Sequence, residues 1–123
     1  MRADGKGHWV TLTSDEMSSA TADGDTLPRP AVVEVVVEGE LDVSSVGRVR
    51  ETLHDALSIR PARLVVDLTD CPFVDACALT MLLDVHRRAW RAGGVLTLRG
   101  CSPRVLRLLS LTGLRRVFDL SEA

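Results

Sequence analysis

The sequence predicts an α/β fold, a single domain in which about three helices pack on one mixed β-sheet. The first observation is the length, since 123 residues provide for one domain and no more. The second is an alternation that begins at Ala31. Short runs rich in valine and leucine alternate with longer segments whose apolar residues recur at helical spacing. The resulting order is β, β, α, β, α, β, α, β, with helical crossovers between strands.

Residues 1–30 are predicted to form an N-terminal leader that contains one short strand. The strand covers residues 8–13 (HWVTLT). Residues 14–30 are acidic and rich in serine, threonine, glycine and proline, which favours a flexible loop. The leader carries three cations and five acids, whereas residues 31–123 carry 12 of each. The domain proper is therefore expected to span residues 31–123 and to be electrically neutral.

The second strand is predicted over residues 31–38 (AVVEVVVE), because β-branched apolar residues dominate this run. The turn Gly39-Glu40-Leu41-Asp42 ends it. A helix is predicted over residues 44–58, with Asp42 or Ser44 as the candidate N-cap. Its apolar side is formed by Val46, Val49, Leu53, Ala56 and Leu57.

The dipeptide Arg60-Pro61 ends this helix, because the residue before proline avoids helical geometry. Residues 63–68 (RLVVDL) predict the next strand, and residues 76–91 predict a second helix with Asp75 as its N-cap. Gly93-Gly94 stops that helix. Its apolar side is predicted to comprise Leu79, Leu82, Leu83, Ala89 and Trp90.

The C-terminal part repeats the alternation once more. Residues 95–99 predict a strand, and Ser102-Pro103 predicts a helix start with serine as N-cap and proline in the first turn. Gly113 suits the left-handed end of this helix. Residues 116–120 (RVFDL) predict the last strand. The residues expected to point inward from the helix are Val105, Leu106, Leu108 and Leu109.

Composition excludes several classes of function. The 15 cations and 17 acids give a net charge of −2, which argues against a nucleic-acid-binding surface. Lys6 is the single lysine and lies in a glycine-rich leader, so neither a phosphate-binding P-loop nor Schiff-base chemistry is expected. No apolar run approaches the ~18 residues of a membrane span, so membrane insertion is not expected.

The cysteines indicate a cytoplasmic protein. Cys71, Cys77 and Cys101 are odd in number and lack the spacing of a zinc site, so they are interpreted as reduced thiols. Residues 1–10 show no apolar core of a signal peptide. The sequence thus predicts no metal, no cofactor and no catalytic residue.

Four stretches together resemble the STAS domain, the family of sulfate transporter and anti-sigma factor antagonist domains. Residues 39–42 (GELD) match the turn after its second strand, and residues 64–68 (LVVDL) match its central strand. Residues 73–79 (FVDACAL) lie where the family usually has F-x-D-S-S/T-G-L. The family's usual C-terminal helix has no counterpart before Ala123. The late matches are Gly93-Gly94, Ser102-Pro103 and Leu109–Phe118, so the resemblance covers about residues 31–120.

The resemblance implies a regulator of transcription that acts by binding. The family's antagonists bind an anti-sigma factor of the serine-kinase type and thereby free a sigma factor, a scheme known as partner switching. The kinase phosphorylates the serine that follows the motif aspartate, which adds about −1.5 to −2 charges within the contact surface and abolishes binding. In this sequence Ala76 follows Asp75, and Cys77 and Ala78 come next. No phosphorylation is therefore expected at Ala76, and Thr80, one helical turn later, is the remaining candidate acceptor.

The resemblance places the partner-binding surface at the GELD turn and at the start of the helix over residues 76–91. Asp42 and Asp75 are expected to order the loops and offer charge, while Ala76 and Cys77 provide a small surface that permits close approach. The full set comprises Asp42, Ser44, Ser45, Asp75, Ala76, Cys77 and Thr80.

Two alternatives stay open. A non-signalling STAS accessory subunit of a lipid-transporting ABC system would use the same surface for docking. A small thiol-dependent enzyme would use Cys77, because a helix N-terminus lowers the pKa of a nearby thiol. No histidine stands near Cys77 in the sequence to act as its base.

Overall fold

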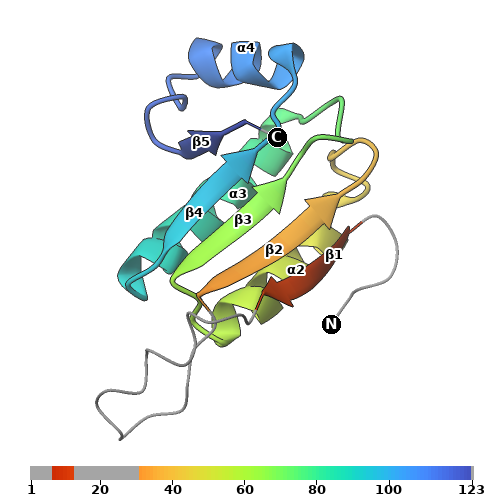
Figure 1. The fold of residues 1–123 in the computed structure, drawn as a ribbon. Coiled ribbons are helices and arrows are strands. Elements are labelled where there is room, and N and C mark those ends of the chain that lie inside the picture. The colour runs from red at the N-terminus through yellow and green to blue at the C-terminus, as the bar shows by residue number, and fades with distance from the viewer. Residues whose placement is uncertain (1–6, 13–30, 123) are drawn as a thin grey trace, which may run out of the picture.

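The computed structural model describes residues 7–12 and 31–122, and for Gly7–Leu12 it describes the backbone only. These residues form one five-stranded sheet in which the strands lie side by side in chain order (Figure 1). β1 is antiparallel to β2, and β2 to β5 are parallel to one another. The strands are β1 (Gly7–Leu12), β2 (Val32–Val37), β3 (Arg63–Asp67), β4 (Val95–Arg99) and β5 (Asp119–Ser121).

Three helices connect the parallel strands of the described chain: α2 (Val46–Ser58), α3 (Ala76–Arg91) and α4 (Pro103–Leu111). Helices α2 and α3 lie on one face of the sheet, and α4 stands beyond the end of β4 (Figure 1). The α/β class, the mixed sheet and the order of elements are thus as predicted.

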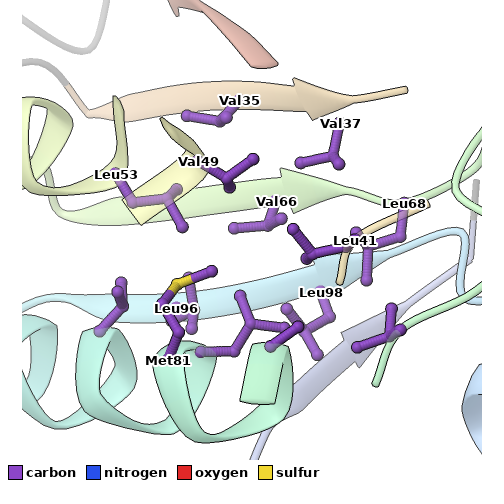
Figure 2. Packing of buried hydrophobic residues seen from close by; sticks show 14 of the residues in the cluster. Val35, Val37, Leu41, Val49, Leu53, Val66, Leu68, Met81, Leu96 and Leu98 are labelled. Atoms are coloured by element: carbon purple, nitrogen blue, oxygen red, sulfur yellow. The ribbon is translucent and has the colours of Figure 1, made fainter. Parts of the chain in front are cut away.

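The hydrophobic core lies between the sheet and helices α2 and α3. In β2 the three residues Val33, Val35 and Val37 are fully buried, and the residues between them are half-buried. This alternation is expected where one face of a strand meets a core. Figure 2 shows Val49 and Leu53 of α2 and Met81 of α3 turned towards the valines and leucines of β2, β3 and β4.

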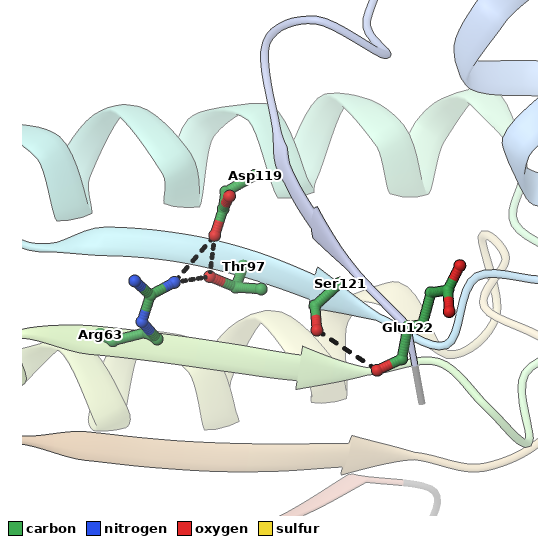
Figure 3. Close-up of polar contacts among 5 residues, drawn as sticks. All are labelled: Arg63, Thr97, Asp119, Ser121 and Glu122. Carbon is green, nitrogen blue, oxygen red and sulfur yellow. Dashed lines mark hydrogen bonds and ion pairs between the residues drawn. The ribbon is translucent and has the colours of Figure 1, made fainter.

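The opposite face of the sheet combines valines with charged side chains, and ion pairs join the charged side chains of neighbouring strands. Arg63 of β3 donates to Asp119 of β5 (2.8 Å) and to the hydroxyl of Thr97 of β4, which itself donates to Asp119 (2.6 Å; Figure 3). These bonds, the one from Thr97 foremost, hold the pKa of Asp119 below its usual value. Arg99 pairs with Asp67 (3.1 Å) and with Glu34. Most of the charge on this face is therefore neutralised internally.

Several boundaries are as predicted. The helix over residues 76–91 and the strand over residues 95–99 are confirmed at both ends. The strand predicted over residues 8–13 is found one residue earlier, as β1. Residues 14–30, predicted to form an acidic flexible loop, lie outside the described residues.

The predicted N-cap of the first helix is wrong. Helix α2 has Ser45 as its N-cap, rather than Asp42 or Ser44. The reason is a turn that precedes the helix, in which the amides of Ser45 and Val46 both donate to the carbonyl oxygen of Asp42 (3.0 and 2.8 Å). Asp42 and Ser44 therefore lie within this turn and not at the position directly before the helix.

The last strand is also shorter than predicted, since β5 begins at Asp119 instead of residue 116. The amides of Val117 and Phe118 both donate to the carbonyl of Leu114, which folds this segment into turns. The turns bury Phe118, whose ring meets that of His86 edge to face at 5.7 Å.

Trp90 does not lie on the buried side of α3 as predicted, because 68% of its surface is exposed. The helix buries its apolar residues up to Ala89, and Trp90 falls beyond the margin of that stripe. Four leucines that were predicted to be interior are only half-buried, because they lie at the edge of the hydrophobic core. They are Leu57, Leu83, Leu106 and Leu108.

Candidate functional site

The predicted site is assembled by two loops that follow neighbouring strands. Residues 39–45 follow β2 and residues 70–75 follow β3, and parallel strands end at the same edge of a sheet. The amides of Gly39 and Leu41 donate to the carbonyls of Asp70 (3.0 Å) and Phe73 (2.9 Å). The amide of Asp75 donates back to Leu41 (3.1 Å). The GELD turn and the start of α3 therefore form one continuous surface.

Asp75 connects the two halves of this surface. One carboxylate oxygen, Oδ1, accepts from the amide of Ala78 (2.8 Å) and thereby caps α3, as predicted. The other oxygen, Oδ2, accepts from the amide of Val43 in the first loop (3.1 Å). The sequence indicated the cap, and the bond to Val43 is a second role that it did not reveal.

Asp42 and Ser45 hold the first loop in shape. Oδ1 of Asp42 accepts from the amide (2.9 Å) and the hydroxyl (2.6 Å) of Ser44. The hydroxyl of Ser45 accepts from the amide of Asp42 (3.1 Å) and donates to the carbonyl of Glu40 (2.9 Å). Ser45 is buried, so it supports the loop from within, while Ser44 is exposed on the surface.

The exposed part of the surface is small and weakly polar. Ala76, Cys77 and Thr80 are exposed on the first turns of α3. The hydroxyl of Thr80 donates to the carbonyl of Ala76 (3.1 Å) within the helix. Val43, which the sequence reasoning did not single out, is 74% exposed beside them. In the sequence, the one feature that could have indicated its role is its position as an apolar residue directly after the GELD turn.

A groove of about 380 Å³ between α2 and α3 adjoins this surface and is called the α2–α3 groove. Asp84 on its rim accepts from Arg88 (2.8 Å), and this bond holds the pKa of the Asp84 carboxyl below its usual value against a smaller opposing effect of burial. The rim therefore presents charges of both signs. Arg50, Met81 and Asp84 were not predicted here. The lining residues are Val46, Arg50, Cys77, Thr80, Met81 and Asp84.

The three thiols differ in exposure. Cys71 is fully buried and donates to the carbonyl of Phe73 (3.3 Å). Burial, together with the nearby Cys71, raises the pKa of Cys101 to about 11. Cys77 is the exposed member of the three.

We expect one fast thiol when the folded protein is titrated with Ellman's reagent at neutral pH. Only an accessible thiolate reacts rapidly, which favours Cys77 over the buried Cys71 and the high-pKa Cys101. Cys77→Ser should remove the fast phase and leave the other two thiols to react after denaturation. Two fast equivalents, or a fast phase that survives Cys77→Ser, would contradict this arrangement.

Among the residues that the structure describes, no group of three His, Cys, Asp or Glu side chains is placed to hold a metal ion. Within the same residues, none of the helices combines the length and apolarity needed to cross a membrane. The candidate site thus consists of two joined loops and an adjoining groove.

Comparison with known proteins identifies the family. The sequence profile of the STAS domain matches residues 25–123. The chain belongs to the STAS domain family. In this STAS domain the GELD turn meets the segment over residues 73–79, which comprises the end of the second loop and the first turn of α3.

Three relatives illustrate the match. A STAS-domain-containing protein of Pseudomonas aeruginosa is 29% identical over 101 residues, which cover 82% of this chain and 93% of that protein. An anti-sigma-B factor antagonist of Bacillus subtilis is 33% identical over 89 residues, covering 72% and 81%. The crystal structure of an anti-sigma factor antagonist from Mycobacterium paratuberculosis has the same fold, with a TM-score of 0.68 over 92% and 85% of the chains at 23% identity.

Proposed function

We propose that this STAS domain is an anti-sigma factor antagonist that binds an anti-sigma factor of the serine-kinase type. The Bacillus subtilis relative, which is 33% identical, is named for antagonism of an anti-sigma factor. The observation that carries the proposal is the joining of the GELD turn to the start of α3 through Asp75, whose carboxylate binds the amide of Val43 and caps the helix that Ala76 begins. Such a surface suits the binding of a partner protein.

The contact surface is proposed to extend from these loops into the α2–α3 groove. Ala76 is the first residue of α3, so only a methyl group separates the helix backbone from a partner. Val43 offers apolar area that a partner would bury. Arg50 and Asp84 at the groove provide charges of both signs, which would set orientation more than affinity.

Without a hydroxyl at position 76, we propose that the domain binds its partner constitutively. A phosphate at the start of α3 would be tolerated by the free helix end, which favours anions. It would be costly inside a close apolar contact, because a buried unpaired charge is strongly unfavourable. With Ala76 in place, this means of releasing the partner is absent at that position.

Ala76→Asp is expected to weaken binding of the anti-sigma factor at least about tenfold, the scale of an unpaired charge in an interface. The measurement is isothermal titration calorimetry against each serine-kinase-type anti-sigma factor encoded in the same genome. Ala62→Asp is the matched control, because Ala62 is exposed and precedes β3 at the opposite end of that strand. Ala76→Ser should retain affinity and take up phosphate from the bound kinase.

Three results would contradict the proposal. The first is that none of these anti-sigma factors binds the wild-type domain. The second is that Ala76→Asp and Ala62→Asp have equal effects, which would remove the start of α3 from the interface. The third is recovery of a transporter ATPase, in place of an anti-sigma factor, when the domain is used to capture its partner.

A further inference from the structure

A second groove lies on the other side of the start of α3, between α4 and the loop over residues 70–75. It has a volume of about 210 Å³ and is called the α4 groove. Val74 and Val105 form a buried apolar floor, while Phe73 (36%) and Leu111 (78%) are exposed at the rim. Its lining residues are Phe73, Val74, Arg104, Val105, Arg107, Leu108 and Leu111, none of which lines the α2–α3 groove.

The groove lies along a second stripe of α4. Val105 and Leu109 face the core, whereas Arg104, Arg107, Leu108 and Leu111 follow the spacing i, i+3, i+4, i+7 and share an outward face. Leu108 also packs against the core, but Arg104, Arg107 and Leu111 are exposed and contribute little to holding this helix to the sheet. Such a stripe is the pattern of a helix that contacts something outside the described fold.

The charged side chains that line the α4 groove have one sign, because Arg104 and Arg107 are among its lining residues and no acidic residue is. On the opposite face of the sheet Arg63 and Arg99 are paired with carboxylates. By contrast, Arg104 and Arg107 form no ion pair with any described residue. The neutral domain therefore presents a cationic, apolar groove.

We propose that the α4 groove binds an acidic segment of a partner protein that inserts at least one large apolar side chain. Arginine pairs with carboxylates through two parallel hydrogen bonds, and the floor of valines accepts an aliphatic or aromatic side chain. A flat bilayer would not reach the concave floor. A nucleic-acid backbone would satisfy the arginines but leave Phe73 and Leu111 against phosphates. The α4 groove is thus a site of its own, whether or not the α2–α3 groove binds an anti-sigma factor.

The probe is a fluorescent helical peptide of about 20 residues, a length at which isolated helices form, with glutamate and leucine on one face. Its counterpart carries lysine in place of glutamate. Fluorescence anisotropy should show at least about tenfold tighter binding of the acidic peptide, with an affinity that falls as salt is added. No saturable binding of the acidic peptide, or equal binding of both peptides, overturns the proposal.

Variants locate the binding. Arg104→Glu/Arg107→Glu should weaken the acidic peptide at least about tenfold and Leu111→Ser several-fold, scales typical of interface charges and apolar anchors. All three side chains are exposed, so the variants should melt like the wild type. Arg87→Glu/Arg91→Glu makes the same change in charge on the exposed end of α3 and should have no effect. An equal loss of peptide affinity in this control would show that the peptide responds to the net charge of the domain and not to the α4 groove.

Two other occupants would each overturn the proposal. The first is a membrane, which would appear as sedimentation of the domain with phosphatidylglycerol vesicles that is lost in Arg104→Glu/Arg107→Glu. The second is another copy of this chain, which would appear in light scattering as a dimer that the same variant dissociates. The proposal expects neither result.

Discussion

Leu82→Ala is expected to lower the free energy of unfolding by about 3–5 kcal/mol. Leu82 is fully buried on the core side of α3, so its removal loses apolar burial and leaves a cavity beneath the sheet. Domains of this size are stable by about 5–15 kcal/mol, and the variant would lose a large part of that. Urea unfolding followed by circular dichroism measures the difference.

Trp90→Ala is the matched control for Leu82→Ala, because it removes a larger side chain from the same helix. Trp90 is 68% exposed, so its free energy of unfolding should change by no more than about 0.5 kcal/mol. If the two variants were destabilised equally, the orientation of α3 against the sheet would be wrong.

Asp75→Ala is expected to cost about 2–3 kcal/mol and to loosen the candidate site at the same time. It removes the cap of α3, worth about 1 kcal/mol, and a charge-assisted hydrogen bond to Val43, worth about 1–2 kcal/mol because that bond is exposed to solvent. Urea unfolding gives the first effect. Faster hydrogen exchange at the amide of Val43 reports the second.

Ser102→Ala is the matched control for Asp75→Ala, because Ser102 caps a helix without joining two loops. Ser102 caps α4 through the amide of Val105 (3.2 Å), and its side chain makes no second bond to another loop of the described chain. It should cost only about 1 kcal/mol, the value of a cap alone. A loss for Asp75→Ala no greater than this, with unchanged exchange at Val43, would mean that the two loops hold together without the carboxylate.

The helix over residues 76–91 was predictable because local signals mark both ends. Asp75 caps the start, and Gly93, with a positive φ of 86°, terminates it. Helical spacing shows that a residue is apolar and in phase, but it does not show how far the neighbouring layer extends. Trp90 was assigned to the core for that reason, although the described chain leaves it exposed.

The candidate site was predictable only in part. The cap formed by Asp75 depends on residues three positions apart, which a sequence displays. Its bond to Val43 spans 32 residues and exists only because β2 and β3 end side by side. The α4 groove was missed because Leu108 was assigned to the interior, whereas it is half-buried and shares an outward face with Arg104 and Arg107.

The paired charges on the open face of the sheet also fix the alignment of β5. This edge strand is only three residues long, so few backbone bonds hold its register against β4. A slip by one residue would exchange the faces of Asp119 and Leu120, placing a carboxylate against the core and a leucine in water. Arg63 and Thr97 stabilise Asp119 only in the observed register. The side chains of Arg63 and Thr97 thus stabilise the observed register of β5 against β4.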